Sequence, residues 1–151
     1  MRRRRWMALL ALLCVAPVVS HAQDKESRQA KRKIADVLSE FNEQMRGYER
    51  ELKYFQRVAA FRPLFDLHAQ LLRQAAQMRQ FEMAGRGSGR AVLELAREMN
   101  RTARQLDAAT AAFEKRAEAV SSREDRAVAE RMKKHADAMV KTLEQLIAMF
   151  R

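Results

Sequence analysis

Large apolar residues recur at every third or fourth position between Ile34 and Phe55, and charged residues fill most of the positions between them. The apolar positions are Ile34, Leu38, Phe41, Met45, Tyr48, Leu52 and Phe55. This spacing places one apolar side chain per turn on the same side of an α-helix. We predict a helix from residue 34 to about residue 60, extended at its start by the polar residues 24–33. Because proline is tolerated at the first position of a helix but not in its middle, Pro63 predicts a corner at residues 61–63.

Three later segments show the same pattern. The second helix is predicted from residue 64 to about residue 84, and the third from residue 91 to residue 120. Three glycines in residues 85–89 separate them and predict a flexible turn, since a phosphate-binding loop would need a preceding strand and a following Gly-Lys-Ser/Thr sequence. A fourth helix runs to the chain end. Its start is predicted at a capping box, formed either by Ser121 with Glu124 or by Ser122 with Asp125.

Four helices that each have one apolar side are stable only when they pack against partners. At roughly 1.5 Å per residue, the first, third and fourth helices span about 40 to 45 Å, and the second spans about 30 Å. With short connections, these lengths favour an all-α fold, an up-down-up-down four-helix bundle. If Pro63 only kinks the chain, the alternative is a long kinked helix plus a helical hairpin, dimerising to bury its apolar side.

The first 22 residues have the pattern of a secretory signal peptide. Residues 2–5 are all arginine, residues 7–19 are apolar, and Ser20-His21-Ala22 is a small-x-small cleavage sequence. The apolar run is shorter than the roughly 20 residues that a membrane-spanning helix needs, and a proline interrupts it, so an uncleaved anchor is disfavoured. We therefore predict a cleaved signal at residues 1–22, a single helical-bundle domain at residues 23–151, and a periplasmic or secreted protein.

Cleavage changes both the cysteine content and the charge. The only cysteine, Cys14, lies in the predicted signal, so the mature chain is held together by packing without disulfides. The four arginines of the signal reduce the 30 basic residues to 26, against 19 acidic residues, and the net charge falls from +11 to +7. Outside the cytoplasm, anionic partners are lipid headgroups, lipopolysaccharide and acidic proteins. We predict no nucleic-acid partner and leave contact with a membrane surface open.

One pair of residues on the predicted apolar sides has side chains that can together bind a metal. Met45 and His135 each lie near the middle of a helix, and thioether with imidazole can ligate haem iron or copper. Methionine and histidine at helical spacing are more often packing residues, so we predict no cofactor and keep Met45 with His135 as an alternative metal site. His68 lies beside the apolar side of its helix and is predicted at the surface or rim.

No catalytic arrangement is visible in the mature chain. It has no cysteine and two histidines, and its serines fall mainly at predicted helix ends or on polar faces. No candidate nucleophile is therefore spaced to meet a general base. We predict that the protein is not an enzyme.

Two surface features remain as candidate partner-binding elements. One is a basic stripe on the third helix, and the other is a second apolar row at the end of the first helix, which either packs under the corner or is exposed to another chain. The predicted partner-binding residues are Arg90, Arg97, Arg101 and Arg104 of the stripe, and Tyr54, Phe61 and Phe65 of the row. Val58 belongs to the same row.

Export, positive charge and a spare apolar row favour a non-enzymatic exported binding protein of the cell envelope, a chaperone-like or adaptor module. Its expected partners are envelope proteins or anionic envelope components, and a homodimer is left open. The alternatives are a haem- or copper-binding four-helix bundle that uses His135 with Met45, and a structural or sensor helical bundle without partner capture.

Overall fold

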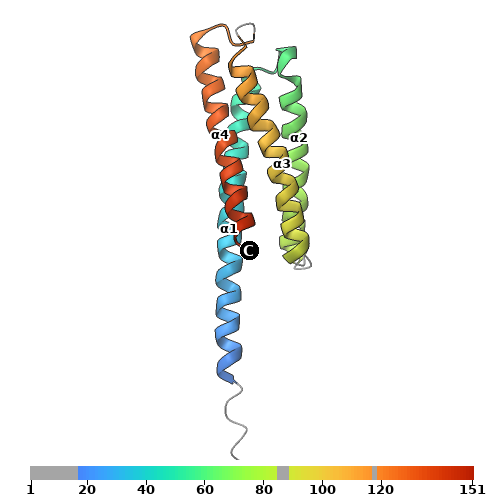
Figure 1. The fold of residues 1–151 in the computed structure, drawn as a ribbon, viewed down its shortest axis with the longest axis vertical. Helices are drawn as coiled ribbons and strands as arrows, with labels where there is room; N and C mark the ends of the chain where they lie inside the picture. Colours follow the sequence, from blue (N-terminus) through green and yellow to red (C-terminus); the bar gives the residue numbers. More distant parts are fainter. Residues whose placement is uncertain (1–16, 85–88, 117–118) are drawn as a thin grey trace, which may run out of the picture. The chain divides into compact units, whose positions relative to one another are not determined.

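The computed structural model describes residues 17–84, 89–116 and 119–151. Its helices, in chain order, are α1 (Pro17–Tyr54), the short 3₁₀-helix η1 (Ala59–Phe61), α2 (Arg62–Ala84), α3 (Gly89–Glu114) and α4 (Arg123–Ala148) (Figure 1). No strand occurs in the described residues. In those same ranges, no helix is both long and apolar enough to cross a membrane.

The chain divides into two units, Met1–Ala35 and Asp36–Arg151. In the first unit, the polar residues 24–33 are helical and exposed, as their composition predicts. The second unit is an all-α four-helix bundle, as predicted. Within it, consecutive helices run in opposite directions (Figure 1). The predicted cleavage between Ala22 and Gln23 falls inside α1 and stays a prediction, and most of the predicted signal lies outside the described residues.

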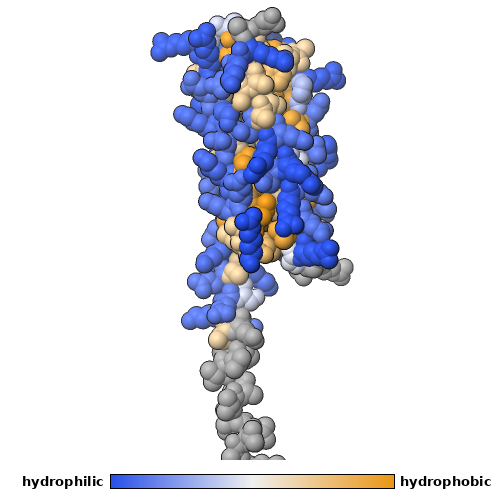
Figure 2. Space-filling view, in the orientation of Figure 1, coloured by the Kyte–Doolittle hydropathy of each residue, from blue (hydrophilic) through white to orange (hydrophobic). Residues whose placement is uncertain are grey.

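The core of the bundle consists of the predicted apolar sides of the four helices. The residues that are less than 2 % exposed are dominated by aromatic, leucine and methionine side chains. They include Phe41, Tyr48, Leu52, Leu64, Leu71, Met78, Met99, Leu106, Met132 and Met139. Hydrophilic residues cover most of the visible outer face, with small apolar areas between them (Figure 2). The 3.6-residue period therefore predicted correctly which side of each helix is buried.

The corner between α1 and α2 differs in position from its prediction. α1 ends at Tyr54 rather than near residue 60, and a turn followed by η1 leads into α2. The ring of Phe61 stacks on Phe55, with centroids 4.0 Å apart, and on Phe113 of α3, with centroids 5.0 Å apart. Pro63 lies in the first turn of α2, where a missing backbone N–H breaks no helical hydrogen bond. The chain therefore turns a corner, and the kinked continuous helix is wrong.

The connection between α3 and α4 also begins earlier than predicted, because α3 ends at Glu114. Val120 is nevertheless buried, from a position outside the helix. At the start of α4, the Asp125 backbone N–H donates to Ser122 Oγ at 3.0 Å, and the Ser122 N–H donates to the Asp125 carboxylate at 2.9 Å. Of the two predicted capping boxes, the one formed by Ser122 and Asp125 is the one present. The Tyr54 hydroxyl donates to the same carboxylate at 2.9 Å, so the end of α1 is bonded to the start of α4.

Candidate partner-binding site at the corner of α1 and α2

The predicted second apolar row does not form one surface. Tyr54 is 46 % exposed and Val58 is 38 % exposed, whereas Phe61 is only 1 % exposed. Phe65 is half-buried. The placement of Phe61 on a partner surface is therefore wrong: η1 turns its ring inwards, where it lies between Phe55 and Phe113.

Two residues of the row, Val58 and Phe65, border an open hollow at the corner, whereas Tyr54 does not line it. The volume of this hollow is about 390 Å³. It is lined by Gln56, Arg57, Val58, Ala59, Arg62, Phe65 and Asp66. We call this site the turn hollow. Sequence periodicity alone could not predict it, because the hollow exists only where α1 stops short and the chain crosses to α2.

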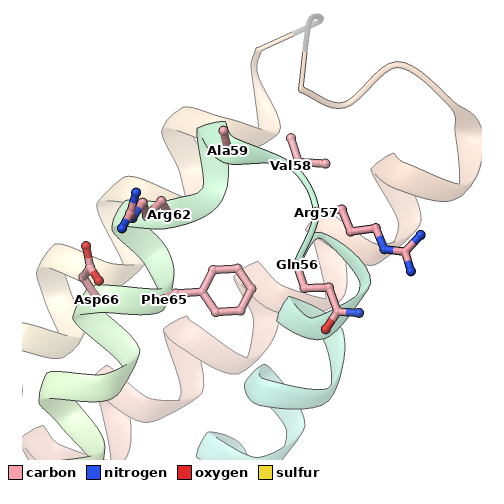
Figure 3. Close-up of a pocket in the computed structure, with 7 residues that line it drawn as sticks. All are labelled: Gln56, Arg57, Val58, Ala59, Arg62, Phe65 and Asp66. Atoms are coloured by element: carbon pink, nitrogen blue, oxygen red, sulfur yellow. The ribbon is translucent and has the colours of Figure 1, made fainter.

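The backbone of the corner positions the lining residues. Val58 has an extended conformation, with φ of −97° and ψ of 108°, which carries the chain from the end of α1 to η1. Figure 3 shows the ring of Phe65 beneath this connection, pointing towards Gln56. In the same view, Arg62 and Asp66 lie on one side of the ring, and Arg57 lies on the other.

The charge around the turn hollow is mainly positive. Among the described residues, neither Arg57 nor Arg62 forms an ion pair, and Asp66 is the one acidic residue in the lining. Nearby, the carboxylate of Asp125 is already used by the backbone of Ser122 and by Tyr54, and these hydrogen bonds lower the pKa of Asp125 to about 2. The turn hollow therefore combines three apolar side chains, Val58, Ala59 and Phe65, with two arginines that form no ion pair among the described residues.

The predicted basic stripe of α3 is partly neutralised. Arg90 pairs with Glu94 at 3.1 Å, and Arg104 pairs with Glu144 of α4 at 2.6 Å. Within the described ranges, Arg97 and Arg101 are exposed and have no ion pair. Arg101 lines a shallow polar cleft of about 230 Å³ between α2 and α3, and none of the four arginines lines the turn hollow.

Met45 and His135 make their contacts with different helices. Met45 is buried and lines a small hollow together with Leu72 of α2. His135 is half-buried, its Nδ1 lies 2.8 Å from Oε1 of Gln44, and its ring lies against Gly47. The apolar period of α4 predicts His135 on the buried side of the helix, yet the fully buried position is the next residue, Ala136. In the part of the chain that is described, no group of three or more histidine, cysteine, aspartate or glutamate side chains could hold a metal ion.

His68 was predicted at the rim, and this prediction is wrong. Its side chain is buried, and the ring stacks on Tyr48 with centroids 5.8 Å apart. Burial lowers the pKa of His68, and the described residues offer no hydrogen-bond partner to its Nε2. A sequence signal for this burial existed, because His68 follows Leu64 by four residues and precedes Leu71 by three.

Tyr48 is the polar neighbour of His68 in the core. Its hydroxyl lies 2.8 Å from Oγ1 of Thr110, and the Thr110 hydroxyl also donates to the backbone carbonyl of Leu106. Burial raises the pKa of Tyr48, so the phenol stays neutral and bonds α1 to α3.

Comparisons of the chain with protein-family models, with curated proteins and with solved structures gave no match. The fold class by itself does not define a function, since four-helix bundles serve many. The observations from which a function can be inferred are therefore the turn hollow, the exposed apolar residues beside it, and its two arginines.

Proposed function

We propose that the protein is a non-enzymatic binding protein of the cell envelope, a chaperone-like or adaptor module that holds its partner at the turn hollow. The observation that carries this proposal is the coincidence of apolar and basic groups at one corner. Val58 is exposed, Phe65 is half-buried, and both border a hollow that Arg57 and Arg62 also line. An apolar surface edged by charge is the usual composition of a protein-binding site.

The two kinds of residue have different roles in capture. Positive charge attracts an anionic partner over a distance and raises the rate of encounter. Apolar contact then slows dissociation, because separating the partners exposes apolar surface to water. Capture should therefore weaken with salt, while the apolar residues determine how long a captured partner stays bound. The export signal predicted from residues 1–22 gives the cell envelope as the compartment.

The stripe of α3 has a secondary place in this proposal. Arg97 and Arg101 are exposed and supply positive charge away from the turn hollow. They extend the attraction to anionic envelope components, including lipid headgroups. Arg90 and Arg104 contribute less, because Glu94 and Glu144 neutralise them.

The proposal is tested by suppression of aggregation of an unfolded exported protein, measured by light scattering at low and high salt. A structural or sensor bundle would have the same fold without this activity. Val58→Ser should reduce suppression several-fold, because it removes an exposed apolar contact at the turn hollow. The matched control is Leu72→Ser, since Leu72 is 37 % exposed and Val58 is 38 % exposed.

An equal loss of suppression in the two variants would show that any exposed apolar residue of the surface suppresses aggregation, rather than the turn hollow in particular. No suppression by the unmodified protein at any ionic strength would leave the structural or sensor bundle as the better interpretation.

A further inference from the structure

We propose that the occupant of the turn hollow is an acidic segment of a protein partner, which inserts one apolar side chain beside Phe65 while its carboxylates meet Arg57 and Arg62. This inference rests on the proposed function and adds the chemistry of the partner. It follows from the shape of the turn hollow, from the placement of charge around it, and from a second, smaller hollow of similar composition.

The shape favours a protruding side chain over a membrane. Binding to a lipid surface requires apolar side chains that project into the acyl region. At the corner, Val58 is an exposed apolar side chain, whereas the larger ring of Phe65 lies beneath the connection between α1 and α2, as a wall of the hollow (Figure 3). The space of about 390 Å³ beside it is open to a group that enters from outside. A buried anchor residue of a partner chain is such a group.

The charge favours carboxylates next to that anchor. Arg57 and Arg62 lie on opposite sides of the Phe65 ring (Figure 3), and neither has an ion pair among the described residues. A guanidinium group can bind a carboxylate through two parallel hydrogen bonds. The carboxylate of Asp66 repels a carboxylate of the partner only on the side of the ring where Arg62 lies. In Figure 3 both guanidinium groups extend away from the ring, so they meet carboxylates that flank the anchor on either side, whereas a basic segment meets two like charges.

A small hollow between α1 and α2 has similar residue types but differs from the turn hollow in volume, which decides whether a side chain of a partner fits. It is lined by Asn42, Met45, Arg46, Glu49, Leu72 and Arg79, so it also has two arginines beside an exposed leucine. Its volume is about 50 Å³, which is room for about one or two waters. The residue types are similar, but no side chain of a partner fits. Arg46 and Arg79 therefore provide a matched control for Arg57 and Arg62.

The test uses fluorescence anisotropy with a labelled acidic peptide that has one central leucine flanked on each side by glutamates. Binding should weaken with added salt. Changing Arg57 and Arg62 to Gln should weaken it about tenfold, and changing Arg46 and Arg79 to Gln should leave it unchanged. Replacing the leucine of the peptide by serine should weaken binding to the same degree, and replacing the glutamates by lysine should abolish it. Circular dichroism of both double variants should match the unmodified protein.

Three results would overturn the inference. The first is that the lysine peptide binds as tightly as the acidic peptide. The second is that both double variants lose the same affinity for the acidic peptide. The third is that vesicles of phosphatidylglycerol bind in a way that depends on Arg57 and Arg62 while the acidic peptide does not bind. If aggregation is still suppressed in any of these cases, only the chemistry of the partner is wrong. If neither the peptide nor the unfolded protein is bound, the proposed function fails as well.

Discussion

At the scale of single residues, the absence of a side chain at Gly47 determines how α1 meets α4. A Cβ at this position would lie 2.7 Å from both Nδ1 and Nε2 of His135, closer than carbon and nitrogen can approach without a shift. The glycine lets the imidazole lie against the backbone of α1 while its Nδ1 stays 2.8 Å from Gln44. Glycine in a helix costs about 1 kcal/mol relative to alanine, so its place here is explained by this contact.

We predict that Gly47→Ala lowers the free energy of unfolding by about 1 kcal/mol, because overpacking that costs about 1 to 3 kcal/mol exceeds the gain in helix propensity. His135→Ala should destabilise the unmodified protein, since it removes the contact with Gln44. In the Gly47→Ala background, His135→Ala should instead stabilise, because it removes the clash. Urea denaturation of the four proteins measures both effects, and simple additivity of the two substitutions would contradict the close contact.

His68 gives the protein a pH dependence that its position in the core explains. Burial lowers the pKa of His68 from its ordinary value of 6.5, with Glu49 and Lys53 acting in opposite directions. The unfolded chain then binds more protons than the folded chain below pH 6.5, so this contribution to stability is present above that pH and is lost as the pH falls.

The expected result is a urea midpoint that declines from pH 7 to pH 5 and declines less in His68→Phe. His135 contributes in the same direction, since burial also lowers its pKa, while Arg50 and Arg131 oppose Glu51 around it. His135→Gln is therefore the comparison variant. An unchanged slope in His68→Phe would show that His68 does not carry the pH dependence.

At the scale of elements, the sequence predicted the buried sides of the helices better than their ends. The period of the apolar residues depends only on helix geometry, so Leu38, Phe41 and Tyr48 are buried as expected. The end of α1 depends on long-range contacts instead. Phe61 leaves the helical register to stack on Phe113, a residue that no local pattern links to the corner. For the same reason, the turn hollow could not be predicted, whereas packing of the second apolar row under the corner was one of its two predicted alternatives and is what Phe61 does.

The start of α4 shows a choice between two local signals. The sequence offered two capping boxes, and the one with Ser122 and Asp125 also gives the Asp125 carboxylate a hydrogen bond from Tyr54 of α1. The other box lacks this contact from a distant residue. A local motif therefore predicted the start of the helix to within one residue. The box that forms, Ser122 with Asp125, is the one that also receives the hydrogen bond from Tyr54.

We predict that Ser122→Ala lowers the free energy of unfolding by about 1 kcal/mol, since it removes the side chain that caps α4. Ser121→Ala is the matched control, because the Ser121 hydroxyl makes only a 3.3 Å contact with the carboxylate of Asp125. Chemical denaturation of both variants distinguishes the two boxes. A larger loss in Ser121→Ala would mean that the other register caps the helix.

At the scale of the whole molecule, the buried residues of the described ranges all follow the segment predicted to be removed. Among the described residues, the first fully buried apolar residue is Leu38, which follows the predicted cleavage site by more than three helical turns. Ala22, on the N-terminal side of that site, is exposed. Removal of residues 1–22 should therefore leave the stability of the bundle unchanged while it lowers the net charge.

We predict that the protein isolated from its native host begins at Gln23, as intact mass spectrometry would show. Ala22→Leu should block this processing, because signal cleavage requires a small residue at that position. The chain of residues 23–151 should have the same urea midpoint as the full-length chain. An intact mass that includes Met1 in the unmodified protein would contradict the predicted signal.

The stacking of Phe61 on Phe113 also bears on the order in which the chain assembles during synthesis. Residues 17–84 leave the ribosome before Phe113 is made, so the ring of Phe61 can then stack on Phe55 but not yet on Phe113. Closing that contact joins residues far apart in sequence, at an entropic cost that rises only slowly with the length between them. A chain that stops before α3 would thus have the corner between α1 and α2 without the ring of Phe113 that packs against Phe61. Capture at the corner should begin only after the third helix has packed.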